Sequence, residues 1–321
     1  MNDMAAAERL FARELPQDDR LWVATETPDG SDNEVHTNDA FSEKWLTLEQ
    51  DPEDTEGWKL FQYEWYLKCY GYESEADFAA FLKTRSVILD AGCGPGYKAA
   101  WFARLAPHAT VVAMDLTDAA RLAAKRYAHL QNFVAVKGDI ADTPFKDATF
   151  DFISCDQVLH HTDCPPDTVK EFARILTGEG QLNTYVYAKK ALPRQLLDDH
   201  LLEYAKQLSK DEIWALSDQL TKLGKTLSEL NIEIDVPEMP ALGIKGGKQD
   251  LQRFIYWNFV KCFWNPEHGY EASKMINFDW YAPSNAYRFS REEFVEMLGG
   301  AGFQPDFLHS EEACHSGRFT R

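Results

Sequence analysis

The stretch VILDAGCGPGYKAAWFAR, residues 87–104, decides the fold. It opens with a short apolar run rich in β-branched residues, as expected for a strand that is buried on both faces of a parallel sheet. Asp90 ends this run, and the glycines and the proline that follow cannot continue a strand. After them, apolar residues recur at helical intervals and stop before Pro107. The stretch therefore predicts a strand, a glycine turn and a helix.

Gly92, Gly94 and Gly96 leave bare backbone between this strand and this helix. Positions without side chains let a ligand approach the main chain closely, and a helix N-terminus presents unpaired N–H groups. Dinucleotide enzymes use G-x-G-x-x-G, whereas here the third glycine comes one residue early and Tyr97 follows it. The spacing therefore argues against NAD. A tight turn that binds no ligand remains the alternative.

Further strands alternate with helices after this turn, at residues 110–114, 133–140 and 150–154, and a last one follows a turn at Gly178 and Gly180. This alternation predicts an α/β fold with a Rossmann-like, doubly wound, mostly parallel sheet. Ligands bind such sheets at the carboxyl ends of the strands. Acids stand at four of those ends: Asp90, Asp115, Asp139 and Asp156. One acid could be a helix cap, but four in register are hard to explain by capping alone.

Asp115 lies about a strand and a helix beyond the glycines, where nucleoside-binding α/β units place a ribose-binding acid. The alternative is that it caps the helix that starts near Asp118. The sequence alone leaves both readings open.

The composition limits the partners and the compartment. Apolar residues make up 45% of the 321 residues, and the formal net charge is −19. This charge opposes binding to nucleic acid or to a membrane surface, so we predict neither partner. The six cysteines are scattered without a CxxC pair, which indicates reduced thiols and a cytoplasmic protein. The N-terminal stretch does not resemble a signal peptide, and no run of about 18 apolar residues occurs.

We expect four regions along the chain: a helical N-terminal extension at 1–80, a cofactor-binding core at 81–190, a helical insertion at 191–278, and the C-terminal part of the core sheet at 279–321. Residues 27–39 read as a polar loop, and an aromatic helix follows with Trp65 on its apolar stripe. The insertion carries helical patterns over 192–231 and 251–265. It forms either a cap over the strand ends, with an apolar acceptor pocket, or the interface of a homodimer. The last residues fit an antiparallel hairpin with a turn near Ser316 and Gly317.

Five motifs occur in order and at ordinary spacing: VILDAGCGPG, VVAMDL, KGDI, FDFISCDQVLHHT and EFARILTGEGQLNTYVY. With them, the chain resembles a class I S-adenosylmethionine-dependent methyltransferase over roughly residues 60–190. The segments at 60–71 and 278–303 resemble a subgroup with an aromatic-Pro segment before the last helix. The resemblance implies S-adenosyl-L-methionine as cofactor and methyl transfer to a small molecule or a glycan precursor. Two alternatives are an enzyme of the same fold that transfers another group and a non-catalytic partner-binding module.

The resemblance also implies roles for the residues at the strand ends. It places the methionine part of the cofactor against Asp90, Gly92, Gly94 and Gly96, the ribose hydroxyls on Asp115, and the adenine against Leu116, Asp139 and Ile140. It places the methionine end and the acceptor beside Cys155, Asp156 and Gln157.

His160 and His161 follow the fourth strand and are the candidate general bases, because imidazole titrates near neutral pH. The alternative is that both only pack and cap the local structure. With Cys164 they imitate a set of metal ligands, but the short spacing and the two prolines that follow argue against one. We predict no metal ion.

The acceptor is expected to bind at an aromatic strip after the insertion. Pro283 disfavours helix at Ala282, so the strip should be extended or turned. Aromatic rings there offer rigid apolar faces, and an arginine would hold a carboxylate or phosphate, which implies an anionic acceptor. The candidate acceptor-binding residues are Trp65, Trp280, Tyr281, Tyr287 and Arg288. Packing of the insertion is the alternative role for Trp280 and Tyr281, and core packing is the alternative for Trp65.

Overall fold

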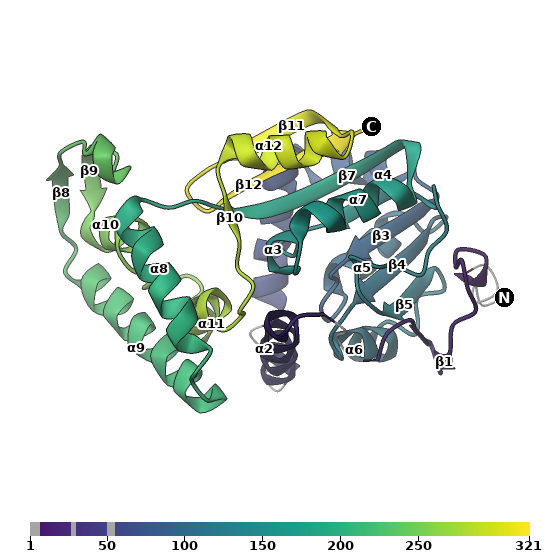
Figure 1. Ribbon diagram of the computed structural model, residues 1–321, viewed down its shortest axis with the longest axis horizontal. Helices are drawn as coiled ribbons and strands as arrows, with labels where there is room; N and C mark the ends of the chain where they lie inside the picture. Colours follow the sequence, from purple (N-terminus) through teal and green to yellow (C-terminus); the bar gives the residue numbers. More distant parts are fainter. Residues whose placement is uncertain (1–6, 27–29, 50–54) are drawn as a thin grey trace. The chain divides into compact units, whose positions relative to one another are not determined.

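The computed structural model describes residues 7–26, 30–49 and 55–321 (Figure 1). It divides the chain into two compact units. The first unit runs to Ala188 and resumes over Tyr287–Arg321, and the second unit is Lys189–Ala286. The cofactor-binding core and the C-terminal part of the chain therefore belong to one unit, and the insertion forms the other.

A mostly parallel sheet is the centre of the first unit (Figure 1). Its strand order is β1-β2-β5-β4-β3-β6-β7-β12-β11, with β10 also paired to β7. The strands are β1 (Gln17–Asp18), β2 (Leu21–Val23), β3 (Val87–Ala91), β4 (Thr110–Asp115), β5 (Phe133–Lys137), β6 (Phe150–Cys155), β7 (Leu176–Ala188), β10 (Arg288–Phe289), β11 (Gln304–Ser310) and β12 (Cys314–Thr320). From β2 to β7 the pairs are parallel, and β12 and β11 add an antiparallel hairpin. The predicted fold class is confirmed.

Helices cover both faces of this sheet. The helical elements of this unit are α2 (Asp32–Glu49), α3 (Thr55–Tyr70), α4 (Glu75–Leu82), α5 (Tyr97–Leu105), α6 (Ala119–Arg126), the 3-10 turn η1 (Leu159–His161), α7 (Pro165–Ile175) and α12 (Arg291–Gly300), and all but α2 pack on the faces of the sheet. Successive strand residues point to opposite faces and both faces are covered, so the central strands are mostly apolar, with acids at or near the carboxyl ends of β3 and β4. Ile88 joins the core under α3, α4, α5 and α6, and Leu89 joins the core under α7 and α12.

The direction of the strand order reverses beside β3. The chain goes from β3 outward to β4 and β5, then returns to the other side of β3 with β6 and β7. In open α/β sheets the ligand crevice lies at the carboxyl ends of the strands at such a reversal. The glycine turn after β3 and the residues after β6 are therefore at the expected position for a ligand.

Several boundaries differ from the predictions, and each difference has a local cause. Residues 32–39 of the predicted polar loop belong to α2, and residues 27–29 lie outside the described residues. Gly178 and Gly180 form no turn before a strand, because β7 runs through them and pairs with β6 and β12. The terminal hairpin turns between Ser310 and Cys314, so Ser316 and Gly317 are strand residues. The N-terminal region, predicted as helical, also contributes β1 and β2 to the sheet.

The second unit is mostly helical. Its elements are α8 (Leu192–Ala205), α9 (Lys210–Glu229), β8 (Glu233–Val236), η2 (Pro240–Leu242), β9 (Gly247–Asp250), α10 (Leu251–Asn258) and α11 (Gly269–Tyr281). Ser209 and Glu212 form a capping box that starts α9. Trp214 of α9 stacks on Phe278 of α11 with ring centroids 4.0 Å apart. The helix predicted over 251–265 ends at Asn258, and the strip predicted as extended is helical up to Tyr281, because its aromatic side chains are buried within this unit.

Within the described part of the chain, no helix has both the length and the apolar character needed to cross a bilayer. All six cysteines are free thiols.

Candidate active site

The glycine turn after β3 has a backbone that favours glycine at three positions. Gly92, Gly94 and Gly96 have φ angles of 76°, 52° and 81°. A Cβ at Gly92 would lie 2.4 Å from a methyl carbon of Val158, and one at Gly94 would lie 2.9 Å from the ring of Trp45. Both left-handed backbone and close neighbours therefore require glycine here. The turn lies at the carboxyl edge of the sheet, where Val158 and Trp45 pack against its backbone.

Asp115 fastens the end of β4 to this turn. Its Oδ2 accepts a hydrogen bond from the Gly94 N–H at 2.7 Å. Its Oδ1 accepts from the Thr117 N–H at 2.9 Å and from the Thr117 hydroxyl at 2.6 Å. Thr117 Oγ1 in turn accepts from the Ala119 N–H at 3.1 Å, so the threonine and not Asp115 caps the start of α6. Asp115 therefore shapes the turn that a cofactor would meet, and its role toward ribose stays a prediction.

Asp90 is a buried acid with a hydrogen-bond acceptor that the described residues leave unused. It is 3% exposed, and its Oδ2 has no hydrogen-bond partner among the described residues. Burial raises the pKa of Asp90 to about 7, with the Lys98 ammonium opposing this shift and the Asp156 carboxylate adding to it. A buried acceptor without a partner costs free energy, so such an atom in a native site calls for an explanation. A cationic ligand group beside Asp90 would supply the missing partner.

Asp156, at the end of β6, is fully engaged by the protein. It forms a buried ion pair with Lys98 of α5. Tyr70 of α3 donates to its Oδ1 at 2.8 Å, and the Gln157 side chain donates to its Oδ2 at 3.1 Å. Burial alone would lower the pKa of Lys98, but the Asp156 carboxylate outweighs this and the net shift is upward. The pair joins the first turn of α5 to the end of β6.

Lys98 was not among the predicted site residues. The sequence held a weak signal for it, because the first turn of the helix after the glycines starts at the same sheet edge as the acids that follow the neighbouring strands. Asp156 is such an acid, and β3 and β6 are paired neighbours. The signal was missed because a lysine on a helix is usually exposed, whereas Lys98 is buried.

Helix α2 lies over the same edge. The Ser31 hydroxyl donates to Asp163 Oδ1 at 2.6 Å, and the rings of Phe41 and His161 are 4.9 Å apart. Burial raises the pKa of Glu34 to about 7, and the nearby carboxylates of Asp139 and Asp163 add to this shift. Acids from α2 and from the edge of the sheet therefore face each other.

The remaining predicted cofactor residues lie around this edge. Leu116 and Asp139 are half-buried, while Ile140 and Cys155 are buried. Asp139 Oδ1 accepts from the Ala141 N–H at 2.8 Å, and burial raises the pKa of Asp139. Gln157 has a positive φ of 64° and also donates to Gln62 of α3 at 3.0 Å.

His160 and His161 form η1 and are buried in an aromatic cluster. His160 is 0% exposed, and its ring centroid is 3.8 Å from that of Tyr187 and 4.1 Å from that of His161. His161 meets the edge of Phe41 of α2. These contacts agree with the packing alternative, and base catalysis by either histidine stays a prediction.

The candidate acceptor residues are divided between the two units. Tyr287 is 42% exposed, its hydroxyl donates to the Asp163 carbonyl at 3.0 Å, and its N–H donates to the His160 carbonyl at 2.9 Å. Arg288 follows it in β10, paired with Tyr187. Both residues are thus beside the segment that follows β6.

Trp65, Trp280 and Tyr281 have other surroundings. Trp65 is half-buried on α3, with Lys68 Nζ over its ring at 4.7 Å. Trp280 and Tyr281 are buried within the second unit, where the Tyr281 hydroxyl donates to Asp198 at 2.7 Å. These contacts agree with the packing alternatives for the three residues, and acceptor binding by them stays untested.

Comparison with known proteins identifies the core. A family model described as a methyltransferase domain matches residues 89–183. A malonyl-[acyl-carrier protein] O-methyltransferase of Legionella pneumophila is 33% identical over 96 residues, which are 30% of this chain and 34% of that protein. A probable S-adenosylmethionine-dependent methyltransferase of Mycobacterium tuberculosis is 34% identical over 95 residues, which are 30% of this chain and 33% of that protein. The chain thus spans about a third of the length of these two relatives.

The chain also matches solved structures at low identity. The S-adenosylmethionine-dependent methyltransferase from Aquifex aeolicus covers 87% of this chain and 97% of its own chain, with 14% identity and a TM-score of 0.44.

Residues 89–183 form a methyltransferase domain. It is a class I, S-adenosylmethionine-dependent methyltransferase domain, as the five motifs predict, and the predicted cofactor is confirmed with it.

Proposed function

We propose that this protein transfers the methyl group of S-adenosyl-L-methionine to a small molecule or a metabolite precursor. The observation that carries the proposal is the carboxylate oxygen of Asp90 that has no hydrogen-bond partner within the described part of the chain and lies beside a glycine turn. S-adenosylmethionine brings an ammonium group and no pyrophosphate, so a buried acid suits it better than a helix N-terminus alone. The acids of β4 and β5 would take the ribose hydroxyls and the adenine edge.

The cofactor supplies a methyl carbon that is already activated by a positively charged sulfur. The protein's part is mainly to hold the reactants in line, which in well-oriented systems is worth up to about 7–11 kcal/mol. Asp115 and Thr117 fix the turn, and the Lys98–Asp156 pair fixes the first turn of α5 on the end of β6. A base is needed only for an acceptor that must lose a proton, and His160 and His161 are the candidates for that step.

The acceptor proposed here is anionic. Arg288 lies directly after Tyr287, next to the segment that follows β6, and a guanidinium can bind a carboxylate or phosphate with two hydrogen bonds. The Legionella pneumophila relative is named as an enzyme that methylates an oxygen of a malonyl group, so acceptors with a carboxylate are the first to test. With a net charge of −19, nucleic acid and membrane are not proposed as partners, and the cytoplasm is the proposed compartment.

Isothermal titration calorimetry tests the cofactor. S-adenosylhomocysteine should bind and NADH should not, and binding of NADH alone would overturn the proposal. Incubation with methyl-labelled cofactor and a set of small carboxylic acids, phosphates and acyl thioesters then tests the reaction. Bound cofactor without transfer to any acceptor would favour the non-catalytic module.

Arg288→Gln tests the anionic acceptor, with Arg291→Gln as the matched control on exposed surface in α12. The Arg288 variant should raise KM for the acceptor and leave the affinity for S-adenosylhomocysteine unchanged. The control should change neither. Equal kinetics for the two variants would contradict acceptor binding by Arg288.

A further inference from the structure

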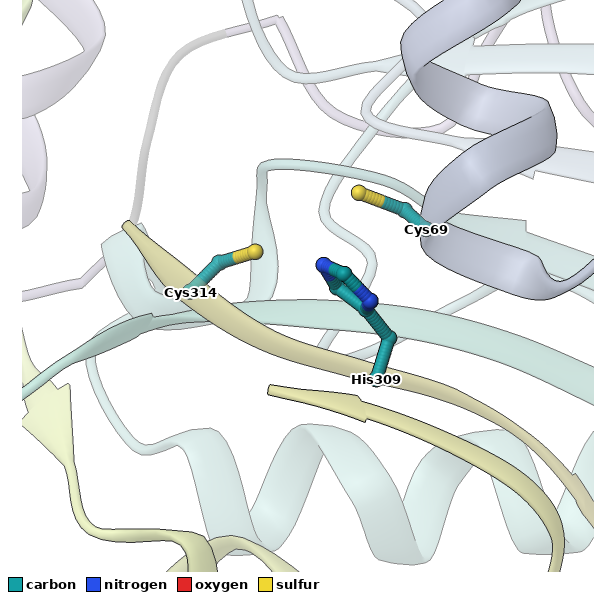
Figure 2. Close-up of side chains that lie close together, drawn as sticks. All are labelled: Cys69, His309 and Cys314. Atoms are coloured by element: carbon teal, nitrogen blue, oxygen red, sulfur yellow. The ribbon is translucent and has the colours of Figure 1, made fainter. Parts of the chain in front are cut away.

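Three metal-ligating side chains meet beside the terminal hairpin of the sheet (Figure 2). Cys69 comes from the last turn of α3, His309 from β11 and Cys314 from the start of β12. One ligand atom of each lies within 4.8 Å of the other two. Both thiols are fully buried. Motif spacing did not suggest this cluster, because two of its members are separated from the third by most of the chain.

Tertiary contacts hold the three elements together without help from the cluster. The Ser316 hydroxyl in β12 donates to the Cys69 carbonyl at 2.8 Å, which fixes the end of α3 on the hairpin. Gly71, just after α3, has a φ of 66°, and a Cβ there would lie 2.5 Å from the ring of Phe307 in β11. The helix end and both strands are therefore in contact, and the three side chains share a space that the backbone has already formed.

The imidazole of His309 faces the thiols of Cys69 and Cys314. One ring nitrogen of His309 points toward the two sulfur atoms (Figure 2). Its Nε2 is buried and has no hydrogen-bond partner among the described residues, although Glu311 Oε2 lies 3.3 Å away. Glu311 also forms an ion pair with Lys68 at 2.7 Å. A buried imidazole nitrogen without a hydrogen bond is an unused donor or acceptor, so a bound ion would satisfy it.

We propose that Cys69, His309 and Cys314 bind a zinc ion. Two thiolates and an imidazole form a soft ligand set that suits Zn²⁺, which takes four ligands in tetrahedral sites. Glu311 Oε2 lies 3.3 Å from His309 Nε2 but is not among the ligand atoms that all lie within 4.8 Å of one another, so water is the candidate for the fourth ligand. Binding displaces the two thiol protons into solvent, so the affinity must fall as the pH is lowered.

The ion would be a structural link with an effect on the active site. It would join α3 to the terminal hairpin at Cys69, and the next residue, Tyr70, donates to Asp156 at 2.8 Å. Nothing in this link depends on the identity of the cofactor or acceptor. The zinc site and the proposed methyl transfer can therefore fail independently.

The test uses the full chain, reduced and stripped of metal with a chelator. Titration with Co²⁺ should give a thiolate-to-cobalt charge-transfer band and the strong visible bands of tetrahedral cobalt, and Zn²⁺ should displace the cobalt with a stoichiometry of one ion per chain. Zinc should also raise the melting temperature, because an ion that binds only the folded state stabilises it.

Two ligand variants and two matched controls make the test specific. Cys314→Ser should abolish the charge-transfer contribution of one thiolate. His309→Gln should weaken zinc binding by more than the roughly 10- to 100-fold that loss of a supporting partner costs. Cys164→Ser removes an exposed thiol and His315→Gln removes a histidine of the same hairpin, so both should bind zinc like the wild type.

His309→Gln decides the matter if a cysteine variant fails to fold, because His309 is partly exposed and its replacement leaves both thiols in place. The proposal is overturned if the reduced wild type binds no cobalt or zinc at micromolar free ion. It is also overturned if His309→Gln and His315→Gln bind equally well. A disulfide between Cys69 and Cys314 in the untreated protein, with no zinc on mass spectrometry and none taken up after reduction, would assign the cluster to redox chemistry instead.

Discussion

The ends of the neighbouring strands β3 and β4 carry acids that look alike in sequence and differ in structure. Both Asp90 and Asp115 are buried, and burial raises the pKa of each. Asp115 accepts hydrogen bonds from Gly94 and Thr117 with both oxygens, whereas Asp90 has an oxygen with no hydrogen-bond partner among the described residues. One acid is used to build the turn, and the other has capacity left for a ligand.

Asp156, at the end of β6, extends the comparison. It is as buried as the other two acids, but Lys98, Tyr70 and Gln157 satisfy it. An acid at a strand end is therefore a poor guide to function by itself. A structural acid is one whose carboxylate oxygens already accept hydrogen bonds or ion pairs from the protein. An acid with an oxygen that lacks such partners is available to a cofactor.

The largest expected effect is at Lys98. Lys98→Met removes the cation from a buried ion pair and leaves Asp156 without its charge partner, a change that typically costs about 3–5 kcal/mol. Urea denaturation should show the unfolding free energy falling by this order. The double variant Lys98→Met with Asp156→Asn should recover part of the loss, because no uncompensated charge remains. A loss below about 1 kcal/mol in the single variant would mean that the pair is solvated, as exposed pairs are.

Asp115→Ala should come next, and its effect should be on folding. It leaves the Gly94 N–H and the Thr117 groups without their acceptor, at about 1–3 kcal/mol for each group that stays buried and unpaired. The melting temperature should fall, and the affinity for S-adenosylhomocysteine should fall with it because the turn is no longer held. Weaker binding at an unchanged melting temperature would show instead that Asp115 acts mainly on the ligand.

Asp90→Asn should weaken cofactor binding and leave folding stability nearly unchanged, whereas Asp115→Ala should destabilise the fold. The amide keeps the shape and loses the charge, so folding at pH 8 should be unchanged or slightly more favourable, since a buried ionised group has been removed. Affinity for S-adenosylhomocysteine should fall by about 1.5–3 kcal/mol, the range for a hydrogen bond to a charged group. Calorimetry and thermal melts on the same samples separate the two quantities. An unchanged affinity for S-adenosylhomocysteine would contradict the proposal that Asp90 binds the ammonium group of the cofactor.

The part of the fold that lies between residues 87 and 188 could be predicted because each strand and its turn are adjacent in the sequence. Apolar runs, glycines and strand-end acids repeat there as local patterns, and the structure has them in the predicted order. The pairing of β2 with β5 could not be predicted, since Leu21–Val23 is too short to show periodicity. Nor could the turn of the last hairpin, because Ser316 and Gly317 favour a turn locally while pairing with β7 and β11 overrides them.

The candidate site could likewise be predicted only in part. The glycines and the strand-end acids were visible as residue types at set positions. Their hydrogen-bond partners were not visible, since Tyr70 and Lys98 reach Asp156 from helices distant in sequence. The hairpin cluster was invisible for the same reason, because Cys69 and Cys314 become neighbours only in the folded chain.

The smallest expected effect concerns Glu34, the acid that α2 brings toward Asp139 and Asp163. The pKa of Glu34 is raised from 4.5 to about 7, so the folded state keeps its proton to higher pH than the unfolded state does. The protonated Glu34 carboxyl therefore makes its full contribution to the unfolding free energy below about pH 4.5, and this contribution is lost as the pH rises toward 7. At 1.36 kcal/mol for each unit of pKa, the full shift would correspond to about 3.4 kcal/mol, and because solvent screens this incompletely buried carboxyl the loss should be about 1–2 kcal/mol. Glu34→Gln cannot ionise, so its unfolding free energy should fall less than that of the wild type between pH 5 and pH 8. The difference between the two proteins reports the ionisation of Glu34 and its repulsion with Asp139 and Asp163, because acids that do not interact with Glu34, such as Asp90, contribute equally to both. Parallel pH profiles would show that α2 does not hold Glu34 against the acids of the sheet edge.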